Sequence, residues 1–232
     1  IDWSLKYIEY DNVYVACNEK RTYDQFKFLA YQIQKTEKKV LYLPNTYPIK
    51  YIKSINKNTV FKTKGEINIG CFGSIRPLKN HLVQAHAAIA FAKAHNRKLK
   101  FHINSAHVED GGNSALLNLI SLFKHSKDCE LVCHGWLEHN EFLDLCETMD
   151  IGMQVSFTET FNIVAADLVS RGVPVVGSNE IVWLYDGFKA VPTSSEDIFA
   201  KLNKIVSLYN SFFRYVDDSQ KKLKKYCERS IE

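Results

Sequence analysis

Residues 156–178, S-F-T-E-T-F-N-I-V-A-A-D-L-V-S-R-G-V-P-V-V-G-S, decide how this chain folds. The segment begins as a polar loop, continues as an expected helix over about 161–171 and ends in a short buried strand over 174–177. An apolar run at 150–155 predicts another buried strand directly before the loop. The loop therefore joins the carboxyl end of a strand to a helix, which is where open α/β sheets bind ligands.

Two acids in this segment, Glu159 and Asp167, are eight residues apart. Eight residues are just over two helical turns, so both carboxylates can share one side and meet one polyhydroxylated ligand. A purely structural interpretation is also open. Glu159 would then be an acid favoured at a helix start, and Asp167 a solvated helix residue. Spacing alone favours the structural interpretation.

Apolar runs alternate with helical patterns from Glu66 onward. Strands are expected at 67–72, 99–104, 130–133, 150–155 and 174–177, with a sixth at 190–192. Helices are expected at 81–96, 114–125, 140–148, 161–171, 195–209 and 213–230. This alternation predicts an α/β fold with a doubly wound, Rossmann-like parallel sheet. Strands that are apolar along their length fit a sheet covered on both faces.

The first part of the chain has a smaller pattern. A strand at 12–17, a helix at 20–35 and a strand at 40–43 predict a partial N-terminal βαβ segment with parallel strands. Asn18-Glu19 is expected to cap the helix rather than line a cleft. The expected apolar face of this helix consists of Phe26, Leu29, Ala30 and Ile33.

Two domains are expected, because residues 46–64 are polar and lysine-rich and resemble a linker. Residues 1–64 would be the last part of one domain, and residues 65–232 a complete second domain with C-terminal helices. The first 64 residues hold 12 Lys or Arg and 6 Asp or Glu, whereas the rest hold 18 and 20, for a net charge of +4. A basic face could contact an acidic acceptor or a membrane surface, but a solvated lysine-rich surface is the favoured interpretation.

Composition places the chain among globular proteins, with 46% apolar and 24% charged residues. No apolar run approaches the roughly 18 residues of a membrane helix. The first residue is Ile and no signal-peptide pattern follows, so an excised fragment is expected. Cys129 and Cys133 lack a second pair for a zinc site, and the six cysteines, Cys71 and Cys133 among them, are expected to be buried free thiols.

The loop Gly73 to Asn80 follows the first strand of the expected sheet. Its glycine allows close backbone approach, and Arg76 and Lys79 before a helix suit a diphosphate. Neither a Walker loop nor G-x-G-x-x-G is present. A turn with two exposed basic side chains is an equally good interpretation.

A second loop, His134-Gly135-Trp136, ends the third strand. Its glycine would let a flat base pack on the backbone beside the tryptophan, whereas ordinary packing of Trp136 is the alternative. His102 and His107 are expected to be structural. All three loops fall at carboxyl ends of strands, so together they predict one crevice suited to a nucleotide diphosphate joined to a sugar.

These motifs resemble the C-terminal, donor-binding domain of GT-B glycosyltransferases of the family 4-like group. The resemblance rests on F-G-S-I-R-P-L-K-N (72–80), H-G-W-L (134–137) and the block from Met149 to Ser178, which has two acids eight apart and a closing G-V-P-V-V. It covers residues 66–210, and 12–45 resemble the end of the family's N-terminal domain.

The resemblance implies specific roles. Arg76 and Lys79 would bind the diphosphate, Glu159 the sugar hydroxyls and Asp167 the ribose. The other implied donor-binding residues are Gly73, Ser74, His134, Gly135, Trp136, Ser156, Thr160, Phe161, Asn162 and Ile163. Asp167 replaces the usual glutamate, and Asn162 stands where glycine is common.

The implied activity is retaining transfer of a sugar from a UDP- or GDP-sugar to an acceptor hydroxyl, without a metal or other cofactor. The acceptor would be a glycan, lipid or protein, and most of the acceptor domain would lie outside this chain or on a partner. The alternative is a non-catalytic nucleotide-sugar-binding module or partner subunit. We expect no nucleic-acid partner, because the basic excess lacks interleaved aromatic residues. The expected location is cytoplasmic, with or without peripheral attachment to a membrane.

Overall fold

The apolar runs between residues 66 and 177 form one parallel sheet of five strands. In the computed structural model, which describes residues 2–34, 37–53, 65–207 and 212–229, the strand order is β5-β4-β3-β6-β7. These strands are β3 (Glu66–Gly70), β4 (Lys98–Asn104), β5 (Cys129–His134), β6 (Ile151–Gln154) and β7 (Val175–Gly177). The α/β, doubly wound fold class is confirmed.

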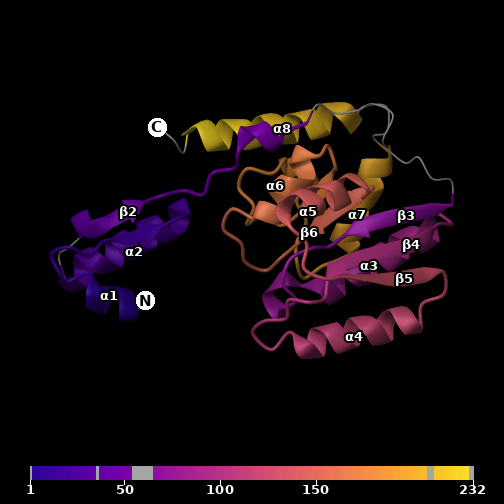
Figure 1. Cartoon of the computed structure of the whole chain (residues 1–232), viewed down its shortest axis with the longest axis horizontal. Coiled ribbons are helices and arrows are strands. Elements are labelled where there is room, and N and C mark those ends of the chain that lie inside the picture. The colour runs from indigo at the N-terminus through magenta and orange to yellow at the C-terminus, as the bar shows by residue number, and fades with distance from the viewer. Residues whose placement is uncertain (1, 35–36, 54–64, 208–211, 230–232) are drawn as a thin grey trace. The chain divides into compact units, whose positions relative to one another are not determined.

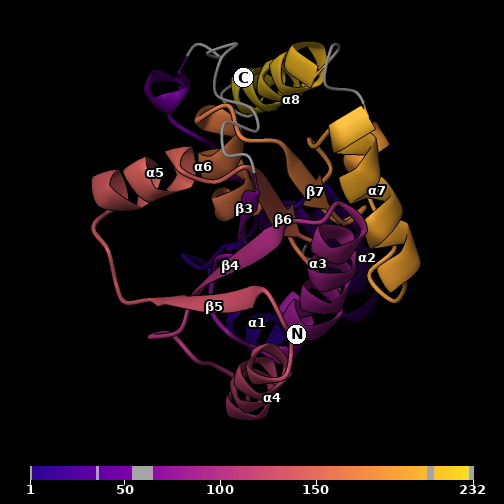
Figure 2. The same cartoon turned by 90° about the vertical axis from the view of Figure 1, so that its right-hand side faces the viewer.

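Helices cover both faces of this sheet, as expected for strands that carry apolar side chains on both sides. Figure 2 shows α3 and α7 on one side of the sheet and α5 and α6 on the other. The helices are α3 (His81–Ala94), α4 (Asn113–Lys124), α5 (His139–Glu147), α6 (Ile163–Ser170), α7 (Ser195–Ser207) and α8 (Phe212–Arg229). Short 3-10 turns are η2 (Ile49–Tyr51), η3 (Pro77–Lys79) and η4 (Asp186–Phe188).

The core of the sheet forms where strand residues meet α3, α4 and α7. Ile69, Phe101 and Val176 are fully buried, and the Phe101 ring stacks on Phe123 with centroids 5.5 Å apart. Ser194 Oγ accepts a hydrogen bond from Asp197 N at 3.1 Å, which confirms the predicted start of α7.

The chain divides into two compact units, Pro48–Lys224 and a smaller one of Ile1–Tyr47 with Lys225–Glu232. Figure 1 shows the elements of both. In the smaller unit, β1 pairs with β2 in parallel, as predicted. The backbone amide of Tyr47 donates to Cys227 Sγ at 3.3 Å, which joins residues 180 positions apart. The elements of the first segment of this smaller unit are α1 (Asp2–Tyr7), β1 (Val15–Cys17), α2 (Lys20–Gln34), η1 (Glu37–Lys39) and β2 (Val40–Tyr42).

Glu19 caps α2, as the sequence predicted. Its carboxylate accepts hydrogen bonds from the backbone amides of Arg21 and Thr22 at 3.1 and 2.9 Å. These bonds satisfy amides that have no partner within the helix. The predicted apolar face is only partly correct, because Phe26 and Ala30 are buried whereas Ile33 is exposed.

Two further expectations are wrong. Residues 190–192 form no strand: the Ala190 amide bonds the Gly177 carbonyl, but the Pro192 carbonyl accepts from the Asn80 side chain instead of a strand. Cys133 is exposed rather than buried, because β5 is the edge strand of the sheet.

Candidate functional site

The site lies at the carboxyl edge of the sheet, where β3 and β6 are neighbours. The chain leaves β3 toward β4 and leaves β6 toward β7 on the opposite side, so this is the topological switch point. A cavity of about 380 Å³ opens here. It is lined by Gly73, Ser74, Asn104, Ala106, His107, Gly135, Trp136, Leu137, His139, Phe142, Ile163, Val164 and Asp167.

Hydrogen bonds join the loop after β3 to the loop after β6. The Phe157 amide donates to the Leu78 carbonyl at 2.9 Å, and Asn80 Nδ2 donates to the Val155 carbonyl at 3.0 Å. Gln84 Oε1 accepts from the Val155 amide at 2.8 Å. Because Asn80 and Gln84 are buried, these bonds fix two distant segments against each other.

Lys79 and Glu159 meet where these two loops are joined. Lys79 Nζ lies 2.5 Å from Glu159 Oε1, and the side chains are only 12% and 7% exposed. The Lys79 stem also passes close to Gly73, on the cavity wall, since a Cβ there would lie 3.9 Å from Lys79 Cε. The structure thus places two of the three predicted catalytic residues in direct contact.

Arg76, the third, lies beside a loop that the sequence did not connect with it. Its Nη1 is 3.9 Å from Asp110 Oδ2. The Ile75 amide donates to the His107 carbonyl and the Glu109 amide donates to the Ile75 carbonyl, at 2.8 and 3.0 Å. This short bridge holds the loop after β4 against the loop after β3.

Asn162 begins α6 and explains how the family's usual glycine can be replaced. Its φ of 57° is left-handed, a conformation that asparagine adopts more readily than most residues. Its Oδ1 accepts from the Ala165 amide at 2.8 Å, and its Nδ2 donates to Gln154 Oε1 at 3.1 Å. The side chain thus caps the helix and anchors it to the end of β6.

Asp167 lines the cavity together with His139, a residue that the sequence did not suggest. His139 Nε2 lies 3.0 Å from Asp167 Oδ1, and the aspartate is buried. The His139 ring packs edge-on against Tyr51, with centroids 5.0 Å apart. The imidazole therefore orients the carboxylate of Asp167, which is one methylene shorter than that of a glutamate.

The side chain of His134 is hydrogen-bonded to that of His102. His102 Nε2 lies 3.1 Å from Asn68 Oδ1, an acceptor, so the proton is on Nε2 and His102 Nδ1 accepts from His134 Nε2 at 2.9 Å. Burial lowers the pKa of His102 to about 4, with His134 adding to the effect. His102 is therefore neutral at neutral pH, and its structural role agrees with the expectation.

The other predicted residues separate into two groups. Gly73, Ser74, Gly135, Trp136 and Ile163 line the cavity with Asp167. Trp136 is 79% exposed, so it stands at the rim. The residues outside the lining are Arg76, Lys79, His134, Ser156, Glu159, Thr160, Phe161 and Asn162; of these, Ser156, Phe161 and Asn162 are buried and Thr160 is exposed.

His107 was expected to be structural, yet it lines the cavity. Its Nε2 lies 2.6 Å from Glu109 Oε1, and its ring lies 6.4 Å from that of Trp136. Hydrogen bonds from His107 and Ser74 lower the pKa of Glu109. The strand-end position of His107 was the signal that could have identified it.

Within the part of the chain that the structure describes, no three His, Cys, Asp or Glu side chains are grouped to hold a metal ion. None of the described helices is both long and apolar enough to cross a bilayer.

The sequence matches no protein-family model, and a search of curated proteins finds no relative. Solved structures are similar. The C-terminal domain of a group 1 family glycosyl transferase (LpcC) from Francisella tularensis aligns with a TM-score of 0.64 and 19% identity, over 77% of this chain and 97% of that domain. HepE from Anabaena, in complex with UDP and glucose, aligns with a TM-score of 0.70 and 13% identity, over 91% of this chain.

A UDP-forming trehalose-phosphate synthase from Burkholderia xenovorans aligns with a TM-score of 0.72 and 12% identity, over 97% of this chain. The chain spans 58% of HepE and 60% of this synthase. Together with the strand order and the helices on both faces, these neighbours show that the chain has the GT-B fold of glycosyltransferases, in the form of its C-terminal domain.

Proposed function

We propose that this chain binds a nucleotide-diphosphate sugar and supplies the donor side of a retaining glycosyltransferase. One observation carries the proposal. A single cavity at the switch point has the Lys79 stem beside its Gly73 wall, Asp167 among its lining residues, and Gly135 with Trp136 at its rim. The diphosphate, ribose and base of one nucleotide would each have a matching group there.

The proposed chemistry is cleavage of the bond between the anomeric carbon of the sugar and the diphosphate oxygen, followed by attack of an acceptor hydroxyl on the same face. The proton of that hydroxyl passes to the departing phosphate oxygen. Lys79 and Arg76 stabilise the negative charge that develops on the leaving phosphate oxygen, because fixed cations act where charge develops. Glu159 accepts hydrogen bonds from sugar hydroxyls once the phosphate draws Lys79 away. The closed Lys79–Glu159 pair supports this exchange, since each group has its counter-charge before the donor arrives.

Asp167 accepts a hydrogen bond from the ribose, and His139 orients its carboxylate. UDP- or GDP-sugars are the proposed donors, and a glycan, lipid or protein hydroxyl is the proposed acceptor. This chemistry needs no metal in the proposed scheme, because Lys79 and Arg76 supply the positive charge.

Titration calorimetry with UDP, GDP and ADP tests the nucleotide site. We expect binding of at least one nucleotide, and a clearly weaker response for the Asp167→Ala variant, which loses the ribose contact. Absence of heat and of competition for all three nucleotides would overturn the proposal.

Glu159→Ala is expected to lower the affinity for the sugar nucleotide about tenfold, the size of a hydrogen bond to a charged group, while the bare nucleotide keeps its affinity. The bare nucleotide is spared because the substitution also releases Lys79. Calorimetry with the matched pair of ligands measures the difference. Equal losses for both ligands would contradict the role of Glu159.

A non-catalytic nucleotide-sugar-binding module is the second candidate. In such a module the Lys79–Glu159 pair would stay closed, because each group already has its counter-charge. The release of free nucleotide from the bound sugar nucleotide distinguishes the two candidates, because only a transferase cleaves the sugar nucleotide. A binding module leaves the ligand intact in the presence of any acceptor.

A further inference from the structure

Charge is distributed very unevenly within the larger unit. Residues 66–127, which form β3, α3, β4 and α4, contain eight Lys or Arg and three Asp or Glu. Residues 128–207 contain four Lys or Arg and thirteen Asp or Glu. The balances are +5 and −9, so residues 66–127 are basic and residues 128–207 are acidic. The overall charge of +4 conceals this polarity.

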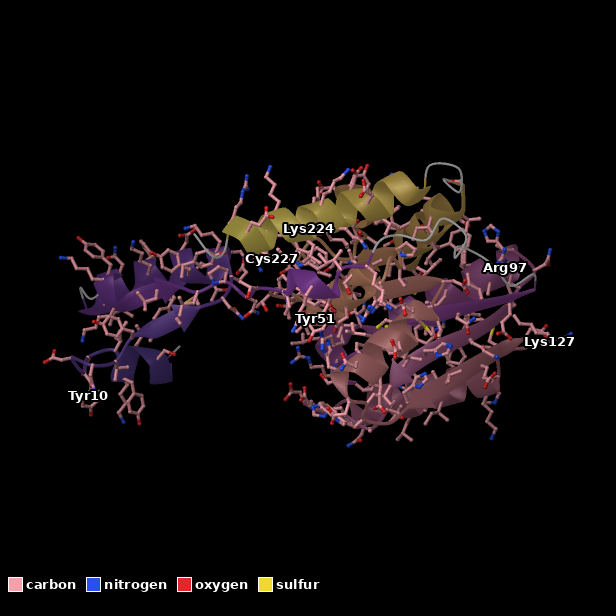
Figure 3. The ribbon with its side chains drawn as sticks, turned by 45° about the horizontal axis from the view of Figure 1, so that its top comes forward. Tyr10, Tyr51, Arg97, Lys127, Lys224 and Cys227 are labelled. Atoms are coloured by element: carbon pink, nitrogen blue, oxygen red, sulfur yellow. The ribbon has the colours of Figure 1, made fainter. Side chains whose placement is uncertain are left out.

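The basic half has a hollow of about 520 Å³ at the amino edge of the sheet, opposite the nucleotide site. Lys93, Arg97, Lys98 and Lys127 line it, and Asp128 is the single carboxylate in that lining. Figure 3 shows Arg97 and Lys127 at the same end of the unit. Lys93 lies in the last turn of α3, and Arg97, Lys98 and Lys127 follow α3 and α4, so these cations lie near the negative ends of two helix dipoles.

α4 adjoins this hollow and has an unusual solvent face. Its twelve residues, N-S-A-L-L-N-L-I-S-L-F-K, include no acid. Leu117 and Ile120 are 67% and 46% exposed. Leu117, Ile120 and Lys124 are spaced three and four residues apart, so they follow one side of the helix toward Lys127.

We propose that this surface, consisting of Leu117, Ile120, Lys124, Lys127 and the basic hollow, docks on an anionic lipid bilayer. A helix with exposed apolar side chains and flanking lysines lies in the membrane interface, where its apolar groups enter the acyl boundary and its cations contact anionic headgroups. Figures 1 and 2 both show α4 at the border of the sheet next to β5, where it packs on one side only. A bilayer fits this surface better than a nucleic acid, because α4 presents aliphatic rather than stacking aromatic side chains.

Vesicle co-sedimentation tests the proposal. The wild-type chain should sediment with vesicles of phosphatidylcholine and phosphatidylglycerol in a ratio of about 7:3, and remain in solution with pure phosphatidylcholine. Lys124→Gln/Lys127→Gln should weaken binding about 25-fold, since each lysine near the surface contributes about fivefold. Leu117→Ser/Ile120→Ser should weaken it about tenfold at unchanged charge.

The matched control is Lys201→Gln/Lys204→Gln on α7, which removes the same charge from the acidic half and should bind like the wild type. Equal loss in this control would overturn the docking surface, because net charge alone would then explain binding. Binding to soluble polyphosphate but not to vesicles would overturn it in favour of a soluble polyanion. A change from dimer to monomer in Leu117→Ser/Ile120→Ser, measured by light scattering, would overturn it in favour of a second copy.

Discussion

Replacing Lys79 with alanine is expected to weaken the binding of a nucleoside diphosphate about hundredfold, measured by calorimetry. A charge-assisted hydrogen bond contributes about 1.5–3 kcal/mol, which alone corresponds to about ten- to hundredfold. The substitution also leaves the Glu159 carboxylate without the cation that lies 2.5 Å away, in a position where it faces the incoming phosphate. The variant therefore loses the attraction between Lys79 and the phosphate and gains repulsion between Glu159 and the phosphate, and both effects weaken binding.

The double variant Lys79→Ala/Glu159→Ala separates these two effects. It should recover about tenfold of the lost affinity, because it removes the unpaired carboxylate as well. Lys189→Ala is the matched control: Lys189 is 10% exposed and lies 2.8 Å from Asp186, but it does not line the cavity, so binding should be unchanged. A double variant that binds no better than Lys79→Ala would show that Glu159 does not face the phosphate.

Gly112→Ala is expected to lower the free energy of unfolding by about 1–3 kcal/mol, a typical cost when an added methyl group forces the backbone to move. A Cβ at this position would overlap the carbonyl oxygen of Ile75. That carbonyl accepts the hydrogen bond from Glu109 that completes the bridge between the loops after β3 and β4. Urea denaturation measures the loss, and calorimetry should show weaker nucleotide binding, since the bridge positions Ser74 at the cavity.

Gly135→Ala provides the control for stability. Gly135 directly follows β5 and lines the cavity, but a Cβ there meets no atom within 4 Å. Its free energy of unfolding should equal that of the wild type. Equal stability of the two variants would mean that the contact with Ile75 imposes no constraint.

The sheet could be predicted from sequence because each of its strands can be recognised from its own residues. All four residues of β6, Ile151 to Gln154, are buried, and only the last of them is polar, so the strand can be recognised from its own composition. Residues 190–192 have the same apolar character, and the difference lies in what they meet. The Pro192 carbonyl bonds the side chain of Asn80, which no local pattern reveals.

The sequence predicted each loop of the candidate site separately, but it did not predict which side chains of different loops contact one another. Glu159 and Lys79 were identified separately, one from the acid spacing and the other from a basic loop. Their contact depends on the hydrogen bonds of Asn80 and Gln84, which connect segments over 70 residues apart. His139 was not predicted either, because its contact with Asp167 depends on the packing of α5 against α6, which no local pattern shows.

The smaller unit is assembled from segments at both ends of the sequence, Ile1–Tyr47 and Lys225–Glu232. During synthesis, the ribosome therefore releases Tyr47 long before its partner Cys227 exists. The residues of the larger unit are contiguous and emerge in between, so they can fold as translation proceeds. The smaller unit can therefore be completed only after the whole of the larger unit has been made.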